Sequence, residues 1–99
     1  MTREILNRAA DLIEQNGHCK GRGADFATGA LCALGGIFFA SEELLSSGTF
    51  WDQRNARRAS REALLKYLGT SPSVWNDHPD RTPEEVITAL RKAASEVAE

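Results

Sequence analysis

The sequence has little of the features that mark specialised protein classes. It contains only two cysteines, Cys19 and Cys32, so it is not a disulfide-dense secreted scaffold. Its formal net charge is -2, so no global field attracts it to nucleic acid or to an anionic membrane. The longest apolar run, Ala30–Ala40, is much shorter than the roughly twenty residues that a membrane span needs. We therefore expect a reduced, cytoplasmic protein without a membrane anchor.

Alternating strand patterns, internal repeats and low-complexity tracts are missing as well, so nothing predicts a β-sheet. The first residues, Met1–Glu4, lead into a charged amphipathic segment and lack the apolar core of a secretory signal peptide. A length of 99 residues with 41% hydrophobic content fits one globular domain over residues 1–99. The expected fold class is all-α.

Four main helices follow from apolar residues at helical spacing and from residues typical of helix ends. They are expected at Thr2–Asn16, from Asp25 or Thr28 to Leu45, at Asp52–Leu68, and from Thr82 towards the C-terminus. The last begins with Thr82-Pro83-Glu84-Glu85, where a capping threonine, a first-turn proline and a reciprocal glutamate form a capping box. The second is apolar almost all round, which predicts a bundle built around it.

Two segments interrupt this pattern. Gly35-Gly36 inside the second helix costs roughly 1 kcal/mol per glycine relative to alanine, which predicts close approach of a neighbouring helix or a kink. Thr70–Arg81 contains Pro72 and Pro79 and is predicted to be a connector. This region superficially resembles a helix-turn-helix, but its second segment is acidic and broken by proline, which disfavours reading of DNA.

The residues that could carry chemistry give no recognised signature. Cys32 with His78 and Asp77 contains the groups of a nucleophile, base and orienting acid, but Cys32 lies in the most apolar segment, which favours an inert core thiol. His18, Cys19, Cys32 and His78 lack the paired spacing of zinc ligands. We predict no catalytic residue, no metal site and no cofactor, with a small cysteine-dependent enzyme kept as a distant alternative.

The glycine-rich stretch Gly17–Gly23 carries Lys20 and Arg22 ahead of the second helix, which makes a weak candidate for an anion site. It follows a helix rather than a strand and lacks the phosphate-binding loop pattern. An interhelical turn is the favoured interpretation.

The only concentrated positive charge lies on the third helix. Arg54, Arg57, Arg58 and Arg61 recur at steps of three and four residues, which places them along one helix face. Their position near the helix N-terminus is electrostatically unfavourable and invites a functional explanation. The alternative is a solvated face paired with acidic side chains, for which the candidates are Glu42, Glu43 and Glu62.

The stretch from Trp75 to Thr82 is predicted to be a structural corner. Trp75 is expected to pack into the core, while Asn76 and Asp77 bond nearby backbone groups. Arg81 is expected to pair with Asp77 or Asp80, ahead of the capping residue Thr82.

Several motifs are distributed over most of the chain: Ala9-Ala10-x-Leu12-Ile13-Glu14, Gly17, Lys20-Gly21, Ala30-Leu31-Cys32-Ala33-Leu34-Gly35-Gly36-Ile37 and Trp75-Asn76-Asp77-x-Pro79-x-Arg81-Thr82-x-Glu84-x-Val86. Together they resemble a family of short uncharacterised proteins of actinobacteria and their bacteriophages. The resemblance implies a domain of unknown function and supplies no catalytic residue. It also implies an accessory protein that works inside a bacterial cell. Members often carry a second cysteine near the position of Cys32, where this chain has Ala33 and Leu34, which argues against a shared metal or redox role.

The sequence therefore favours a non-catalytic interaction module that binds a host or phage protein. Arg54, Arg57, Arg58 and Arg61 would form its charged rim, and the exposed aromatic pair Phe50-Trp51 its anchor, with Trp51 as the candidate binding residue. Weak nucleic-acid binding through the same arginines is the alternative and predicts steep salt dependence. A homodimer is also compatible with so apolar a second helix.

Overall fold

The chain folds into five helices, and the computed structural model describes all residues from 1 to 99. They are α1 (Thr2–Asn16), α2 (Ala33–Leu44), α3 (Phe50–Leu68), α4 (Pro72–Asp77) and α5 (Pro83–Ser95). There is no strand; two isolated bridges join His18 and Ala24 to Leu31. The predicted all-α class is confirmed, whereas the expected number of four helices is one too few.

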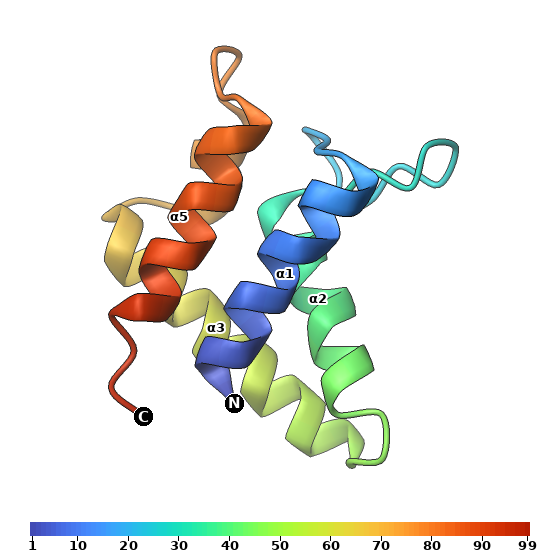
Figure 1. Ribbon diagram of the computed structural model, residues 1–99, viewed down its shortest axis with the longest axis vertical. Coiled ribbons are helices and arrows are strands. Elements are labelled where there is room, and N and C mark those ends of the chain that lie inside the picture. The colour runs from blue at the N-terminus through green and yellow to red at the C-terminus, as the bar shows by residue number, and fades with distance from the viewer.

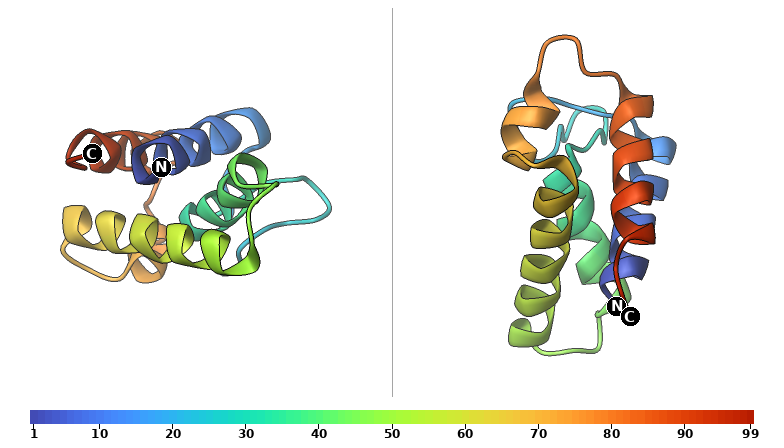
Figure 2. Two further views of the ribbon diagram at one scale, coloured as in Figure 1. Left: turned by 90° about the horizontal axis from the view of Figure 1, so that it is seen from below. Right: turned by 90° about the vertical axis from the view of Figure 1, so that its left-hand side faces the viewer.

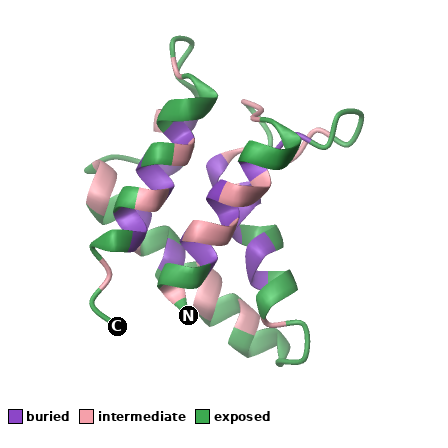
Figure 3. Cartoon of the chain, viewed as in Figure 1, coloured by how far each residue is buried: buried purple, intermediate pink, exposed green.

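The helices form two layers. α1 and α5 lie side by side and antiparallel in one layer, with α3 behind them and α2 beside α1 (Figures 1 and 2). Buried residues gather on the helix faces that look into the space between these layers (Figure 3). The largest fully buried apolar side chains are Ile5, Leu6, Ile13, Ile37, Leu64, Val86 and Leu90.

The centre of the packing is α1 and not α2, which corrects the sequence-based expectation. α1 contacts α5, α2 and α3, and its inward face is closed to solvent. α2 buries Ile37 and Ala40 but leaves Phe38, Phe39 and Leu44 exposed. Apolar character around the whole circumference of α2 therefore did not mean burial around the whole circumference.

α2 begins later than expected, at Ala33 instead of Asp25 or Thr28. Residues 25–29 form a tight turn, because Gly29 has the left-handed φ of +82° and its amide donates to the carbonyl of Asp25 at 2.7 Å. The next residues stay extended, because the amide of Leu31 bonds Gly17 and its carbonyl accepts from Cys19. The start of the apolar run thus serves as loop backbone, and only the remainder is helical.

The two glycines of α2 are explained by two different close approaches. A β-carbon on Gly36 would lie 3.2 Å from that of Ala9, so this glycine lets α1 approach α2 as the sequence predicted. A β-carbon on Gly35 would lie only 1.9 Å from the carbonyl oxygen of Gly23. The second approach is made by the glycine-rich loop and not by a helix.

α3 and α4 also differ from expectation. α3 starts at Phe50, two residues early, because Thr49 and Asp52 form a reciprocal capping box. α4 occupies part of the predicted connector: Ser71 caps it with Pro72 at the first helical position. It ends at Asp77 because His78 precedes Pro79 and takes extended backbone (ψ 132°).

The start of α5 agrees with the sequence. Thr82 caps the helix, Pro83 follows, and Glu85 closes the capping box onto the Thr82 amide at 3.0 Å. The bounds of α1 are also those predicted. None of the helices combines the length and apolar character that a membrane crossing requires.

Candidate interaction surface

The four arginines of α3 come together along one groove between α2 and α3. Their side chains line it from α3, and three apolar side chains of α2 line it from the other helix: Leu34, Ile37 and Phe38, which we call its apolar floor. Ile37 contributes little surface to this floor because it is only 2% exposed. The groove has a volume of about 610 Å³. The sequence identified the cations as one face of a helix, but it gave no sign that α2 would supply an apolar floor beneath them.

Aromatic rings hold two of these guanidinium groups. The guanidinium carbon of Arg57 lies 4.9 Å from the centre of the Phe38 ring, and that of Arg54 lies 5.4 Å from the Trp51 ring. Both distances are typical of cation–π contacts, which orient a guanidinium without neutralising its charge. The face is therefore partly ordered before any partner binds.

The groove is short of negative charge. Arg58 pairs with Glu62 at 3.3 Å, one helical turn along α3. The other acidic candidates do not take part: Glu43 pairs with Arg8 of α1 at 3.0 Å, and Glu42 forms no ion pair. Three arginines, Arg54, Arg57 and Arg61, thus have no carboxylate within 4.0 Å. The predicted pairing of this face with the chain's own acidic residues holds for one of the four cations.

The aromatic pair Phe50-Trp51 lies at the N-terminal end of this face. The two rings make an edge-to-face contact with centroids 5.5 Å apart, and both side chains are more than 60% exposed: 64% for Phe50 and 61% for Trp51. Trp51 does not line the groove itself but contacts Arg54, which does. The exposed aromatics therefore continue the arginine groove towards the α2–α3 loop.

A second cluster of polar residues surrounds Asn76 of α4, which is only 1% exposed. Its Oδ1 accepts from the amide of Ala33 at 3.0 Å and lies 2.8 Å from Nε2 of His18. Its Nδ2 donates to the carbonyl of Cys19 at 3.1 Å and to Oδ1 of Asp77 at 2.9 Å. One side chain thus joins α4 to the glycine-rich loop and to the N-terminus of α2.

Asp77 extends this connection to the loop. Its Oδ1 accepts from the Gly21 amide at 2.9 Å, and this hydrogen bond, with that from Asn76, lowers the pKa of the Asp77 carboxyl. Lys20 donates from Nζ to the carbonyl of Pro79 at 3.0 Å. The loop that the sequence offered as a weak anion site is therefore tied to the chain's own acceptors.

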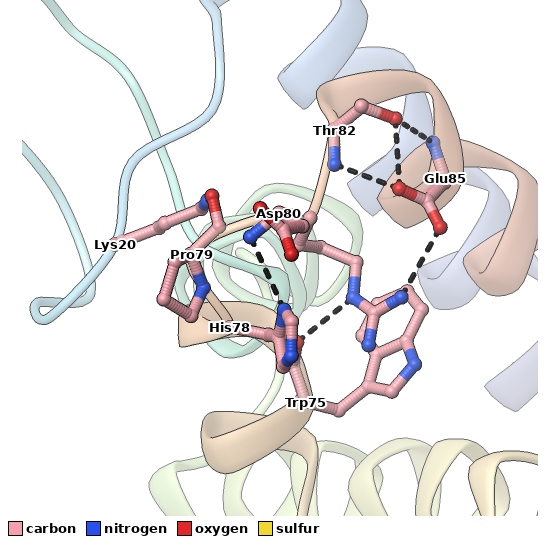
Figure 4. A network of polar contacts seen from close by, with 8 residues as sticks. Lys20, Trp75, His78, Pro79, Asp80, Thr82 and Glu85 are labelled. Atoms are coloured by element: carbon pink, nitrogen blue, oxygen red, sulfur yellow. Dashed lines mark hydrogen bonds and ion pairs between the residues drawn. The ribbon is translucent and has the colours of Figure 1, made fainter.

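Figure 4 shows the Trp75–Thr82 corner. It is held by Arg81, although not as expected. The Arg81 guanidinium lies 3.9 Å from the centre of the Trp75 ring, and its Nε donates to the Trp75 carbonyl at 2.9 Å. Its Nη1 pairs with Glu85 at 3.1 Å rather than with Asp77 or Asp80. The hydrogen bond from the Thr82 amide, together with Arg81, lowers the pKa of Glu85. Trp75 itself is half-buried against the core.

The proposed nucleophile set does not come together. Cys32 caps α2, and its Sγ accepts from the Gly35 amide at 3.2 Å. Cys32 and Asp77 share the wall of a small cavity of about 230 Å³, but His78 does not line it. Nδ1 of His78 instead accepts from the amide of Asp80 at 3.1 Å.

The residues weighed as metal ligands are also dispersed. No group of three or more His, Cys, Asp or Glu side chains is arranged to hold a metal ion. Burial raises the pKa of the Cys19 thiol, whose Sγ lies 3.5 Å from the carbonyl of Arg22. A thiol in this environment is less reactive than a free cysteine, because the thiolate is the nucleophilic form.

Comparison with known proteins places the chain in one family. The model described as "Family of unknown function (DUF6197)" matches residues 1–96, almost the whole chain. No curated protein and no solved structure matches the chain.

Proposed function

We propose that this chain, which belongs to that family of unknown function, is a non-catalytic protein-binding module. Its α2–α3 groove receives an acidic segment of a partner protein that also carries an apolar anchor. The observation that carries this proposal is the groove itself, where three arginines without a carboxylate partner stand over an apolar floor. We call this surface, lined by Leu34, Ile37, Phe38, Arg54, Arg57, Arg58 and Arg61, the arginine groove.

The spacing of the cations supports a helical or extended peptide as the ligand. Arg54 and Arg61, with Arg57 between them, lie seven residue steps apart on α3, which corresponds to about 10 Å along the helix axis. Carboxylates at three- and four-residue steps of a partner helix repeat at the same interval. An arginine guanidinium binds a carboxylate through two parallel hydrogen bonds, so each pair adds orientation as well as attraction.

Binding of a protein segment is favoured over nucleic acid by the apolar floor and by the small number of unpaired cations. Nucleic-acid affinity grows with the number of phosphates neutralised, and three arginines in a chain of net charge -2 neutralise few. A floor of Leu34, Ile37 and Phe38 gives no advantage to a phosphate backbone but takes an apolar side chain of a protein partner.

The cellular setting belongs to the same proposal. The resemblance to short proteins of actinobacteria and their bacteriophages, carried by the Trp75-Asn76-Asp77 and Arg81-Thr82 motifs, supports an accessory protein in the bacterial cytoplasm. The partner is then a host or phage protein with an acidic, amphipathic surface segment.

The test uses a defined probe, a fluorescein-labelled helical peptide with glutamates and phenylalanines at three- and four-residue steps. Fluorescence anisotropy should show binding to the natural chain and at least a tenfold loss with Arg57→Glu combined with Arg61→Glu. Lys66→Glu is the matched control, because Lys66 is exposed on α3 but lies outside the groove.

Two results would contradict the proposal. One is equal affinity of the natural chain and the double variant for the acidic peptide. The other is stronger binding of a labelled oligonucleotide than of the peptide, with steep loss of affinity as salt rises, which would establish the nucleic-acid alternative.

A further inference from the structure

A hydrogen-bonded turn between the glycine-rich loop and α2 projects from the body of the molecule (Figures 1 and 2). The Asp25 carbonyl accepts from the amides of Thr28 and Gly29, at 3.3 and 2.7 Å. The Asp25 carboxylate accepts from the Ala27 amide at 3.0 Å, and the Asp25 amide donates to the Ala30 carbonyl at 2.8 Å. The turn is therefore ordered by its own hydrogen bonds, although it extends away from the helices.

This turn presents Phe26, whose side chain is 91% exposed, more than any other large apolar residue of the chain. An exposed phenylalanine on an ordered turn has the properties of an interface anchor. Docking such a turn costs little conformational entropy because the backbone is already fixed. Burial of the ring then supplies a hydrophobic contact at the centre of the interface.

Negative charge surrounds this anchor. Asp25 precedes Phe26 in the turn, and Glu42 of α2 lines the same cleft behind it, without an ion-pair partner. Glu43 is also part of this cleft, but Arg8 neutralises it. The projecting Asp25–Gly29 turn thus combines an apolar anchor with one carboxylate, that of Asp25, which forms no ion pair, while Glu42 of α2 stands in the cleft behind it. An apolar anchor beside a carboxylate is the ligand chemistry proposed above for the arginine groove.

We propose that the arginine groove of one copy binds the Asp25–Gly29 turn of a second copy. This inference rests on the proposed function of the groove and names a partner for it. Phe26 contacts the apolar floor, and Asp25 pairs with the unpaired arginines at the rim. The turn projects from the body of the molecule (Figure 2), whereas the arginine groove is a hollow between α2 and α3.

The two surfaces differ, so the contact is head to tail. Each added copy leaves one free turn and one free groove, and the assembly grows with concentration into a ring or an open chain. An external acidic segment competes with the turn for the same groove. Binding of a partner protein therefore dissociates the assembly, and self-association regulates access to the groove.

The experiment measures mass by sedimentation velocity over a wide range of protein concentration, with two variants that each lack one surface. Phe26→Ser removes the anchor, and Arg57→Glu with Arg61→Glu removes the groove. The natural chain should increase in average mass with concentration, while each variant alone stays monomeric. An equimolar mixture of the two variants should form dimers and stop there, because one intact turn and one intact groove meet and no surface remains.

Val74→Ala is the matched control, because it truncates another exposed apolar side chain without touching either surface, and it should assemble as the natural chain does. A natural chain that stays monomeric at every concentration overturns the proposal. So does assembly that persists in both variants. If the natural chain stays monomeric but still binds the acidic peptide, only the proposed self-association is wrong. If the natural chain neither assembles nor binds the peptide, the proposed function of the arginine groove is wrong as well.

Discussion

The Asn76 cluster and the arginine groove both contact α2, but their polar groups differ in whether they have partners within the chain. Asn76 is buried, and its oxygen and nitrogen bond to the loop, to α2 and to Asp77. The arginine groove is open to solvent, and three of its four cations lack a carboxylate partner. Polar groups that satisfy one another hold a fold together, whereas cations without partners remain available to a ligand. This contrast is why we assign structure to the first region and binding to the second.

The largest effect is expected from Asn76→Ala. The substitution leaves the Ala33 amide and the Cys19 carbonyl without partners, and unpaired buried groups cost about 1–3 kcal/mol each. The free energy of unfolding should fall by about 3 kcal/mol in urea denaturation. Asn55→Ala is the control, since Asn55 is exposed on α3 and makes no side-chain hydrogen bond. Equal stability of the two variants would remove the structural role assigned to Asn76.

The next effect is expected from Gly35→Ala. The added methyl group would lie 1.9 Å from the Gly23 carbonyl oxygen, so the loop must move away from α2. Overpacking of this kind costs about 1–3 kcal/mol, which thermal denaturation followed by circular dichroism measures. Gly23→Ala is the control on the other side of the contact, because a β-carbon there meets nothing within 4 Å. If Gly35→Ala unfolds at the same temperature as the natural chain, the loop does not pack closely against α2 at this position.

A smaller effect concerns acid stability. Hydrogen bonds to Asp77 make its pKa lower in the folded than in the unfolded chain, where the value is near 3.8. The ionised carboxylate therefore stabilises the fold above this value, and the contribution is lost as the pH falls through the folded pKa. Asp77→Asn should therefore lose less stability than the natural chain as the pH falls below about 3.8. Asp80→Asn is the matched control, because the same substitution is made three residues away at a carboxylate that accepts no hydrogen bond.

The smallest effect on stability is expected in the arginine groove. Arg57→Glu with Arg61→Glu removes a cation–π contact but no ion pair, so the free energy of unfolding should change by less than about 1 kcal/mol. The same variant should lose its affinity for the acidic peptide. A loss of binding without a loss of stability separates the effect on binding from an effect on folding. A loss of stability as large as that of Asn76→Ala would mean that these arginines hold the fold and would erase the contrast between the two regions.

Sequence reasoning was most successful where the decisive contacts are local. The capping box of α5 depends on residues three positions apart, so Thr82 and Glu85 could be recognised without a structure. Ser71-Pro72 carries a similar signal for the start of α4, but Pro72 and Pro79 in the same stretch predict a connector, so the pattern does not indicate this helix. The arginine face followed from helical spacing alone.

The site could be predicted only in part, for reasons of long-range packing. The floor of the groove comes from α2, and Phe38 reaches Arg57 because the two helices pack against each other. Of the two predicted starts of the second helix, Asp25 places Phe26 inside the helix and Thr28 leaves it just outside, and neither indicates that it is exposed on a turn. A lone aromatic residue between Asp25 and a Thr28-Gly29 turn is the only local signal for it.

By itself, the sequence determined the all-α class, the bounds of α1, the start of α5 and the grouping of four arginines on one helix face. These depend on periodicity and capping, which act over a few residues. Tertiary structure decided that α1 is the central helix, that Ala30–Cys32 stays extended, and that Asn76 bridges the loop to α2. It also decided that the four arginines face apolar side chains of α2 and that only one of the four, Arg58, has a carboxylate partner. The physical reason is that burial and charge pairing depend on neighbours tens of residues away, which no local pattern records.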